Sequence, residues 1–226
     1  MTPAVRSYHH GDLRHALIDE GMKLARTGGP EAVTLREVTR AVGVSPNAAY
    51  RHFADREDLV RAVATEAQLA LARAIGQRVA ATPPGLPQAE ASVERLRRVG
   101  HAYIDFARAE RGWFEMAFSI QDVQPSEGIV TLDDEVVAPF QLLLDTLDEM
   151  VDAGALDPER RPFAEWACWS SVHGFAEIAV HGPVQWQPAP VIDALAHAVV
   201  ESTITGVRGT TAALDAATRG ARSSAT

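Results

Sequence analysis

Two short helical segments joined at one glycine constrain the fold of this chain more than any other feature. Apolar residues recur at helical spacing from Leu35 to Val42. Thr34 stands three residues before Glu37, the spacing at which each side chain caps the other residue's backbone amide. Gly43 follows directly, and glycine readily takes the left-handed conformation that a sharp turn requires. The pattern predicts a helix over 35–42 that ends in a tight turn.

A second helix is predicted immediately after this turn. Ser45 is a typical N-cap residue, and Pro46 has a fixed φ that suits the first helical position. We expect this helix to run to about Phe53. The DNA major groove admits one such helix, while the preceding helix braces it across the backbone. The two segments therefore favour a helix-turn-helix.

The remainder of the chain also has helical periodicity, and no segment predicts a strand or an internal repeat. Residues 121–130 look irregular, and three prolines mark 182–190 as a loop. The fold class is therefore all-α. Further helices are expected over 11–26, from a cap at Asp55 to about 79, through 96–106, over the short aromatic segment 113–118, and over 132–151, 157–181 and 191–207.

We divide the chain into an N-terminal domain over 1–56 and a second helical domain over 57–208. Residues 209–226 are rich in Ala, Thr and Ser and have no apolar face, so they predict a disordered tail. The two domains differ in charge. Residues 1–56 hold eight basic and six acidic residues, whereas the remainder holds thirteen basic and twenty-four acidic ones, for a net charge of −9. A mildly basic first domain on an acidic body indicates a small DNA-docking surface that depends on specific contacts.

Composition indicates what class of protein this is and where in the cell it is located. Its 226 residues are 46% hydrophobic and 23% charged, as expected of a globular protein, and no apolar run approaches the length of a membrane span. The N-terminus lacks an apolar signal core. Cys168 is the single cysteine, so no intrachain disulfide can form. We expect a cytoplasmic protein without a membrane partner.

The motif of the first domain resembles the DNA-binding signature of TetR/AcrR-family transcription regulators. The resemblance covers roughly residues 10–60 and rests on the segments 34–39, 42–45, 50–53 and 56–59. Thr39 departs from it, because the family commonly has Ala at this crossing between the two helices, and Asn47-Ala48 replaces a frequent Gly-Thr pair. The difference at Asn47-Ala48 affects which operator sequence is recognised.

The resemblance implies a role for each matching residue. Thr34, Tyr50, His52 and Arg56 would contact phosphates, and Ser45 would cap the recognition helix. Asn47 and Ala48 would face base edges, where Asn can hydrogen-bond adenine and Ala or Pro46 can pack on a thymine methyl. The implied partner is a palindromic operator in double-stranded DNA, with repression as the family default. The predicted DNA-binding residues are Thr34, Arg36, Ser45, Pro46, Asn47, Ala48, Tyr50, His52 and Arg56.

The second domain resembles the regulatory domain of these regulators less specifically. The segment 165–174 is similar to the Trp-His-Gly segment of one branch of the family. The resemblance implies that its helix and the last helix form a homodimer interface. It also implies a pocket for a small, largely apolar effector of unknown identity, although simple core packing is the alternative interpretation of each aromatic. The predicted pocket residues are Tyr103, Phe106, Trp113, Phe114, Phe118, Phe140, Leu144, Leu147, Trp169 and His173.

Two other functions compete with DNA-binding regulation. The first is a helical enzyme that uses Cys168 and His173, although residues five apart on one helix do not face each other. The second is a helical interaction protein that does not bind DNA, which would leave the predicted phosphate contacts unexplained. We expect no catalytic residues, no cofactor and no metal site, because His9, His10 and His15 lack further ligands at the usual spacing.

Overall fold

The computed structural model describes residues 10–119 and 139–209, and within these ranges it contains helices and no strand. The all-α prediction is confirmed. The α-helices are α1 (His10–Gly28), α2 (Leu35–Val42), α3 (Pro46–Ala49), α4 (Arg56–Ala80), α5 (Gln88–Ala109), α6 (Arg111–Ala117), α7 (Pro139–Asp152), α8 (Ala164–Val180) and α9 (Ala189–Arg208). Short 3-10 turns lie at η1 (Pro30–Ala32), η2 (Pro158–Arg160) and η3 (Pro183–Trp186).

The helices form two compact units. The head unit holds described residues 10–73 and 109–119, and the body unit holds 74–108 and 139–209. These limits differ from the predicted domains 1–56 and 57–208. The first part of α4 and all of α6 belong to the head unit because their apolar residues pack into its core, with Val63 and Met116 both fully buried there.

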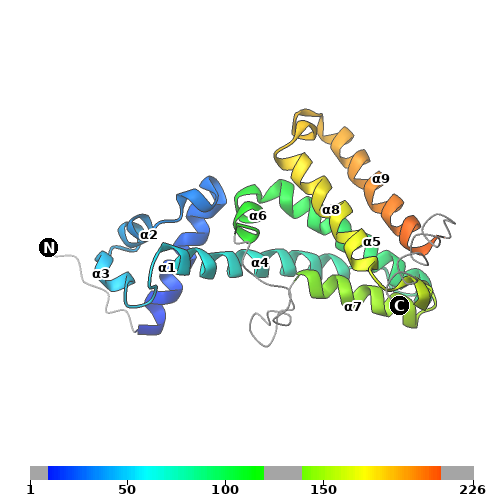
Figure 1. Ribbon diagram of the computed structural model, residues 1–226, viewed down its shortest axis with the longest axis horizontal. Coiled ribbons are helices and arrows are strands. Elements are labelled where there is room, and N and C mark those ends of the chain that lie inside the picture. The colour runs from blue at the N-terminus through cyan, green and yellow to red at the C-terminus, as the bar shows by residue number, and fades with distance from the viewer. Residues whose placement is uncertain (1–9, 120–138, 210–226) are drawn as a thin grey trace, which may run out of the picture. The chain divides into compact units, whose positions relative to one another are not determined.

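The head unit is built around α1. Figure 1 shows α2 and α3 beside α1, and their apolar faces share one core with the first part of α4. Leu17, Val38 and Phe53, from three different segments, are almost completely buried in this core. Burying side chains of this size contributes about 1.5–3 kcal/mol each. The core therefore fixes the position of α3, which is too short to be stable alone.

Helix α6 packs closely on the C-terminal half of α1. Gly112 is buried so near α1 that an added Cβ would lie 2.0 Å from the carbonyl oxygen of Ala25. Beside it, the indole N–H of Trp113 donates to the carbonyl of Met22 at 2.7 Å. The guanidinium of Arg26 lies over the Trp113 ring, 5.1 Å from its centre. These contacts hold α6 in the head unit.

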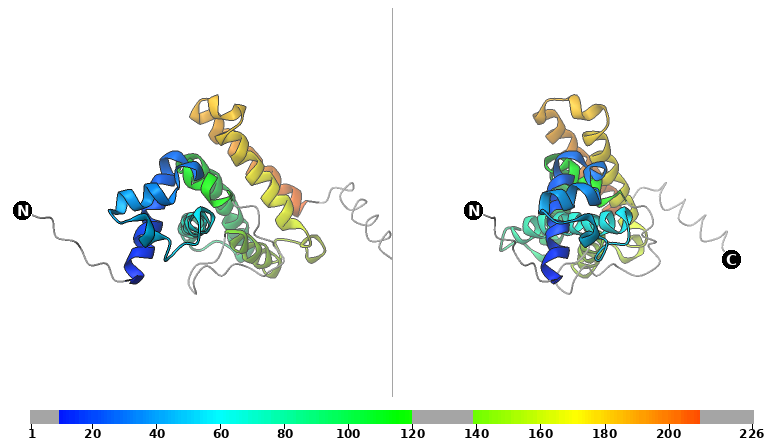
Figure 2. Two further views of the ribbon diagram at one scale, coloured as in Figure 1. Left: turned by 60° about the vertical axis from the view of Figure 1, so that its left-hand side comes forward. Right: turned by 90° about the vertical axis from the view of Figure 1, so that its left-hand side faces the viewer.

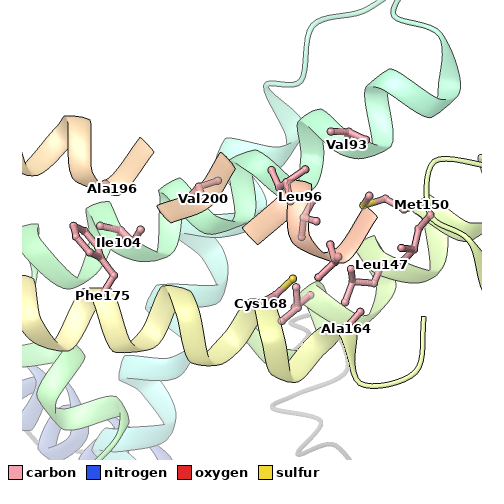
Figure 3. Packing of buried hydrophobic residues seen from close by; sticks show 14 of the residues in the cluster. Val93, Leu96, Ile104, Leu147, Met150, Ala164, Cys168, Phe175, Ala196 and Val200 are labelled. Atoms are coloured by element: carbon pink, nitrogen blue, oxygen red, sulfur yellow. The ribbon is translucent and has the colours of Figure 1, made fainter. Parts of the chain in front are cut away.

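The body unit contains the second core, formed by α5, α7, α8 and α9. Figure 3 shows their side chains meeting, among them Leu96 of α5, Leu147 of α7, Cys168 of α8 and Val200 of α9. Helices α8 and α9 lie side by side in both views of Figure 2 and are joined through η3. The acidic Glu201 of α9 pairs with Arg97 of α5 and adds a polar link at the edge of this core.

The helix predicted through 96–106 is longer in the structure, as α5, and two other predicted helices are not continuous. The helix predicted over 157–181 is broken, because Pro162 lacks an N–H and its ring would clash with the carbonyl four residues earlier. The chain turns there at Phe163, whose φ of 68° lies in the left-handed region, and α8 starts afterwards. The helix predicted from Ser45 to Phe53 ends at Ala49 and continues as turns. The irregular segment 121–130, residues 132–138 of the predicted helix and tail residues 210–226 lie outside the described residues.

Candidate functional site

The turn between α2 and α3 has the predicted local geometry. The backbone N–H of Glu37 donates to Oγ1 of Thr34 at 3.2 Å, so Thr34 caps α2. Gly43 has a φ of 80°, in the left-handed region. The N–H groups of Gly43 and Val44 both donate to the carbonyl of Thr39, at 2.9 and 3.0 Å. This left-handed cap ends α2 and redirects the chain into α3.

Thr39, which departs from the family pattern, fits its buried position. Its side chain is 1% exposed. Its hydroxyl donates to the carbonyl oxygens of Leu35 at 2.7 Å and Arg36 at 3.1 Å, both within α2. The extra polar group is satisfied inside its own helix, so it leaves no unpaired donor in the head core.

Helix α3 presents a polar face to solvent and buries the opposite one. Asn47 and Tyr50 are exposed, Tyr50 by 57%, whereas Ala49 and Phe53 are buried. Of the other predicted DNA-binding residues, Arg36, Ser45, Pro46 and Arg56 are exposed, and Thr34, Ala48 and His52 are half-buried. An exposed amide and phenol on a helix held by a rigid core can form hydrogen bonds with base edges and phosphates.

Two of these residues differ from their predicted roles in the contacts that they make. Ser45 occupies the N-cap position of α3, but its side chain makes no capping hydrogen bond. The guanidinium of Arg56 donates to the carbonyl oxygens of Val33 at 3.0 Å and Pro30 at 2.8 Å. Because these two bonds tie the start of α4 to the segment that precedes α2, they favour a role for Arg56 in positioning the helix-turn-helix.

A small apolar cavity of about 30 Å³ lies inside the body unit. Its walls come from the body part of α4 and from α5, α7, α8 and α9. This volume holds about two water molecules. A larger ligand therefore requires the surrounding helices to move apart. The lining residues are Ile75, Leu96, Val99, Gly100, Tyr103, Pro139, Leu143, Cys168, Trp169, Val172, His173, Val200, Thr203 and Ile204.

The polar part of the cavity wall is an aromatic cluster from α5 and α8. The hydroxyl of Tyr103 lies 2.7 Å from Nδ1 of His173. The Trp169 ring stacks on His173 with a centre separation of 5.6 Å and meets Tyr103 edge-on at 5.5 Å. Burial raises the pKa of Tyr103 well above its usual value, with a smaller contribution from the charge of Glu177. Burial lowers the pKa of His173, and Glu177 opposes that change only in part.

The structure brings only some of the predicted pocket residues to this cavity. Tyr103, Trp169 and His173 line it. Trp113, Phe114 and Phe118 belong to the head unit instead. Phe106, Phe140, Leu144 and Leu147 are body residues outside the lining, where Leu147 is fully buried core and Phe140 packs against Trp169.

Sequence reasoning missed most of the lining residues, which are aliphatic. The helical stripe of Leu96, Val99 and Tyr103 on α5 was visible in the sequence as an apolar face. However, periodicity shows which face of a helix is buried and does not show where buried faces leave a cavity. The pairing of α5 with α8 and α9 was needed to locate it.

Large apolar side chains are exposed at the start of α8 and along α8, η3 and α9. We call this surface the α8–α9 face. Gly174 lies in the middle of α8, and an added Cβ there would meet no atom within 4 Å. Large apolar side chains are normally buried, so exposed ones on neighbouring helices make this face a candidate contact surface. Its exposed large residues are Phe163, Trp166, Ile178, Trp186, Val191 and Leu195.

The Cys168 thiol is not activated, and the described residues form no metal-binding group. Burial raises the pKa of the Cys168 thiol to about 12, so it is protonated at neutral pH and is a poor nucleophile. No group of three His, Cys, Asp or Glu residues lies close enough to hold a metal ion in residues 10–119 and 139–209. In the same ranges, no helix has both the length and the apolar character to cross a membrane.

The fold and the exposed α3 place this chain among helix-turn-helix DNA-binding regulators with a second helical unit. Comparison with family models agrees. Residues 17–63 match the bacterial regulatory proteins of the tetR family, and residues 96–203 match the tetracyclin repressor-like C-terminal domain. The chain belongs to the TetR family, whose members are transcription regulators and not enzymes.

Solved structures share this fold. A protein of unknown function from Rhodococcus sp. RHA1 is 24% identical, with a TM-score of 0.70 over 91% of this chain and 100% of that one. A TetR variant from Acinetobacter baumannii AYE, in complex with minocycline, is 19% identical, with a TM-score of 0.57 over 86% and 97%. The regulator PfmR from Thermus thermophilus is 20% identical, with a TM-score of 0.52 over 83% and 96%. A comparison with curated protein sequences gives no match.

Proposed function

We propose that this protein is a cytoplasmic repressor that binds a palindromic operator as a dimer and is released by a small, largely apolar effector. The observation that carries the proposal is the exposed polar face of α3, held by a buried core directly after a left-handed turn. This arrangement suits insertion of one helix into the major groove. The apolar cavity supports release by an effector, and the α8–α9 face supports dimerisation.

At the DNA, Asn47 reads a base edge and Tyr50 contacts a phosphate. Asn47 lies on α3 and Tyr50 directly follows it, and both side chains are exposed. Thr34, Arg36, Ser45 and His52 add phosphate contacts around the turn, and Pro46 and Ala48 pack against bases. Arg56 acts by holding the helix-turn-helix through its bonds to two head-unit carbonyls.

A gel-shift assay with the promoter region beside the protein's own gene tests DNA binding. We expect a sequence-specific complex that Asn47→Ala weakens by about 1–3 kcal/mol at one operator position, with relaxed preference there. Gln77→Ala is the matched control, because it removes an exposed amide from α4 in the body unit. Failure to bind this DNA or a randomised operator library would show a helical interaction protein instead.

Dimerisation is the second part of the proposal. Two copies joined through the α8–α9 face would bury its exposed aromatic and aliphatic residues in one symmetric interface. The two recognition helices would then meet half-sites about one helical turn apart, roughly 34–36 Å. We expect light scattering to show a dimer at micromolar concentration, and a stable monomer would contradict the proposal.

Gly174 offers a sharp test of that interface. Because an added side chain there meets open space within one copy, Gly174→Leu should leave the monomer folded and weaken association. Gly76→Leu is the matched control, since Gly76 is also a helical glycine with open space but lies on α4. Equal dimer dissociation constants for the two variants would remove Gly174 from the interface.

Effector release is the third part. A ligand larger than the cavity selects a conformation of the body unit in which the helices are further apart. Ligand binding then lowers the affinity for DNA only if the DNA-bound state disfavours that conformation. Mass spectrometry of small molecules released from the purified protein identifies candidates. Gel shifts with and without each candidate then test release. A ligand that binds without reducing DNA affinity contradicts the mechanism.

A further inference from the structure

We propose that the Tyr103–His173 hydrogen bond is the polar recognition element of the cavity and selects a neutral ligand that carries a hydroxyl group on an aromatic body. This inference rests on the proposed effector function and adds the chemical class of the ligand. The hydrogen bond joins α5 to α8 at a distance of 2.7 Å, and both of its residues line the cavity.

The charge of the ligand follows from what the cavity wall lacks. Among the described residues that line it, there is no lysine, arginine, aspartate or glutamate. An ionised ligand would therefore lose its hydration without gaining a counter-ion, which costs far more than the apolar contacts return. A carboxylate is disfavoured further, because Glu177 lies 3.9 Å from Nε2 of His173. The wall selects neutral molecules.

The aromatic body follows from the rings around the hydrogen bond. Trp169 stacks on His173 and meets both Tyr103 and Phe140 edge-on. Flat rings interact favourably with aromatic side chains in such offset and edge-on arrangements. The other lining residues are mostly aliphatic, and the hydroxyl of Thr203 already donates to the carbonyl of Val199 within α9.

The hydroxyl follows from the two polar atoms. The nearby carboxylate of Glu177 favours a proton on Nε2 of His173, which makes Nδ1 the acceptor of the Tyr103 O–H. A ligand hydroxyl can enter this bond, accepting from Tyr103 and donating to His173. An ether or ketone can replace only one of the two contacts, and a methyl group replaces neither. A ligand that opens the bond without replacing it leaves buried polar atoms unpaired, which weakens its binding.

Equilibrium dialysis with full-length protein and three probes tests the inference. The probes are 2-naphthol, 2-methylnaphthalene and 2-naphthoate, which share one ring system and carry a hydroxyl, a methyl group of similar size and a carboxylate. We expect 2-naphthol to bind about tenfold more tightly than 2-methylnaphthalene, because one hydrogen-bonded pair is kept in one complex and lost in the other. We expect 2-naphthoate to bind more weakly than 2-naphthol by at least the same factor.

Variants of Tyr103 and His173 test whether their hydrogen bond causes the preference for 2-naphthol over 2-methylnaphthalene. The double variant Tyr103→Phe/His173→Leu should reduce the ratio of the 2-naphthol and 2-methylnaphthalene affinities to about one, because each single variant leaves one polar atom with which a ligand hydroxyl can still pair. Thr146→Val is the matched control, because it removes a buried hydroxyl of the same unit that donates within α7 and does not line the cavity. It should leave the ratio unchanged. Since both affinities are measured on one preparation, partial unfolding of a variant lowers both and leaves their ratio intact.

Several results would overturn the inference. They are equal binding of 2-naphthol and 2-methylnaphthalene to the unaltered protein, an unchanged ratio in the double variant Tyr103→Phe/His173→Leu, binding of 2-naphthoate as tight as that of 2-naphthol, or binding of none of the three probes. Failure of the proposed function is distinguishable, because it would appear as 2-naphthol binding in dialysis without any release of operator DNA in a gel shift.

Discussion

Replacing Gly112 with alanine should destabilise the head unit strongly, although alanine is the better helix former. The new Cβ would lie 2.0 Å from the carbonyl oxygen of Ala25 and 2.6 Å from that of Arg26, both backbone atoms of α1. Backbone cannot swing aside as a long side chain can, so α6 must move away from α1. That movement breaks the bond from the Trp113 indole to the Met22 carbonyl.

The size of the effect follows from these contacts. Forcing an extra methyl group into a packed contact costs about 1–3 kcal/mol. Loss of the half-buried indole hydrogen bond adds about 0.5–1.5 kcal/mol. The gain in helix propensity from Gly to Ala returns at most about 1 kcal/mol. The free energy of unfolding of the head unit should therefore fall by about 2–3 kcal/mol in the Gly112→Ala variant.

Amide hydrogen exchange of α1 peptides measures this change, because it reports the head unit separately from the body unit. Exchange in α1 should become roughly 30- to 150-fold faster, as tenfold corresponds to about 1.4 kcal/mol. Gly76→Ala is the matched control, since an added Cβ there meets nothing within 4 Å, and α4 should gain about 0.5–1 kcal/mol. Exchange in Gly112→Ala within threefold of the unaltered protein would refute the close α1–α6 contact.

Two further predictions concern charged and titratable groups. Arg56→Ala should lower the free energy of unfolding of the head unit by about 1–2 kcal/mol, because the carbonyls of Val33 and Pro30 each lose a hydrogen bond from the guanidinium. The salt dependence of DNA binding should stay the same, and a slope shallower by about one unit per subunit would show instead that Arg56 contacts a phosphate. Burial lowers the pKa of His173 from 6.5 in the folded state, so the unfolded chain binds its proton first. Stability of the body unit should consequently be complete above about pH 6.5 and decrease as the pH falls below it, and urea titrations should show a smaller decrease in His173→Gln.

The helix-turn-helix could be predicted from the sequence because its signals are local. Thr34 and Glu37 are three residues apart, and Gly43 directly follows the helix that it ends. Capping bonds and a left-handed turn depend on neighbours in the chain, so the predicted bounds of α2 agree with the observed ones. Pro162 was an equally local signal for the break before α8, and its effect follows from the missing N–H.

The tertiary structure decided which apolar faces meet. The aromatic segment 113–118 is compatible with either a ligand pocket or core packing, because periodicity does not identify the segment against which a helix packs. Trp113 donates to the Met22 carbonyl, 91 residues away in sequence, and this contact helps to place α6 in the head unit. Tyr103 and His173 are 70 residues apart and meet only because α5 packs against α8. Local interactions within a few residues thus determined the DNA-binding motif, whereas the cavity and its polar pair depend on long-range packing that no short stretch of sequence encodes.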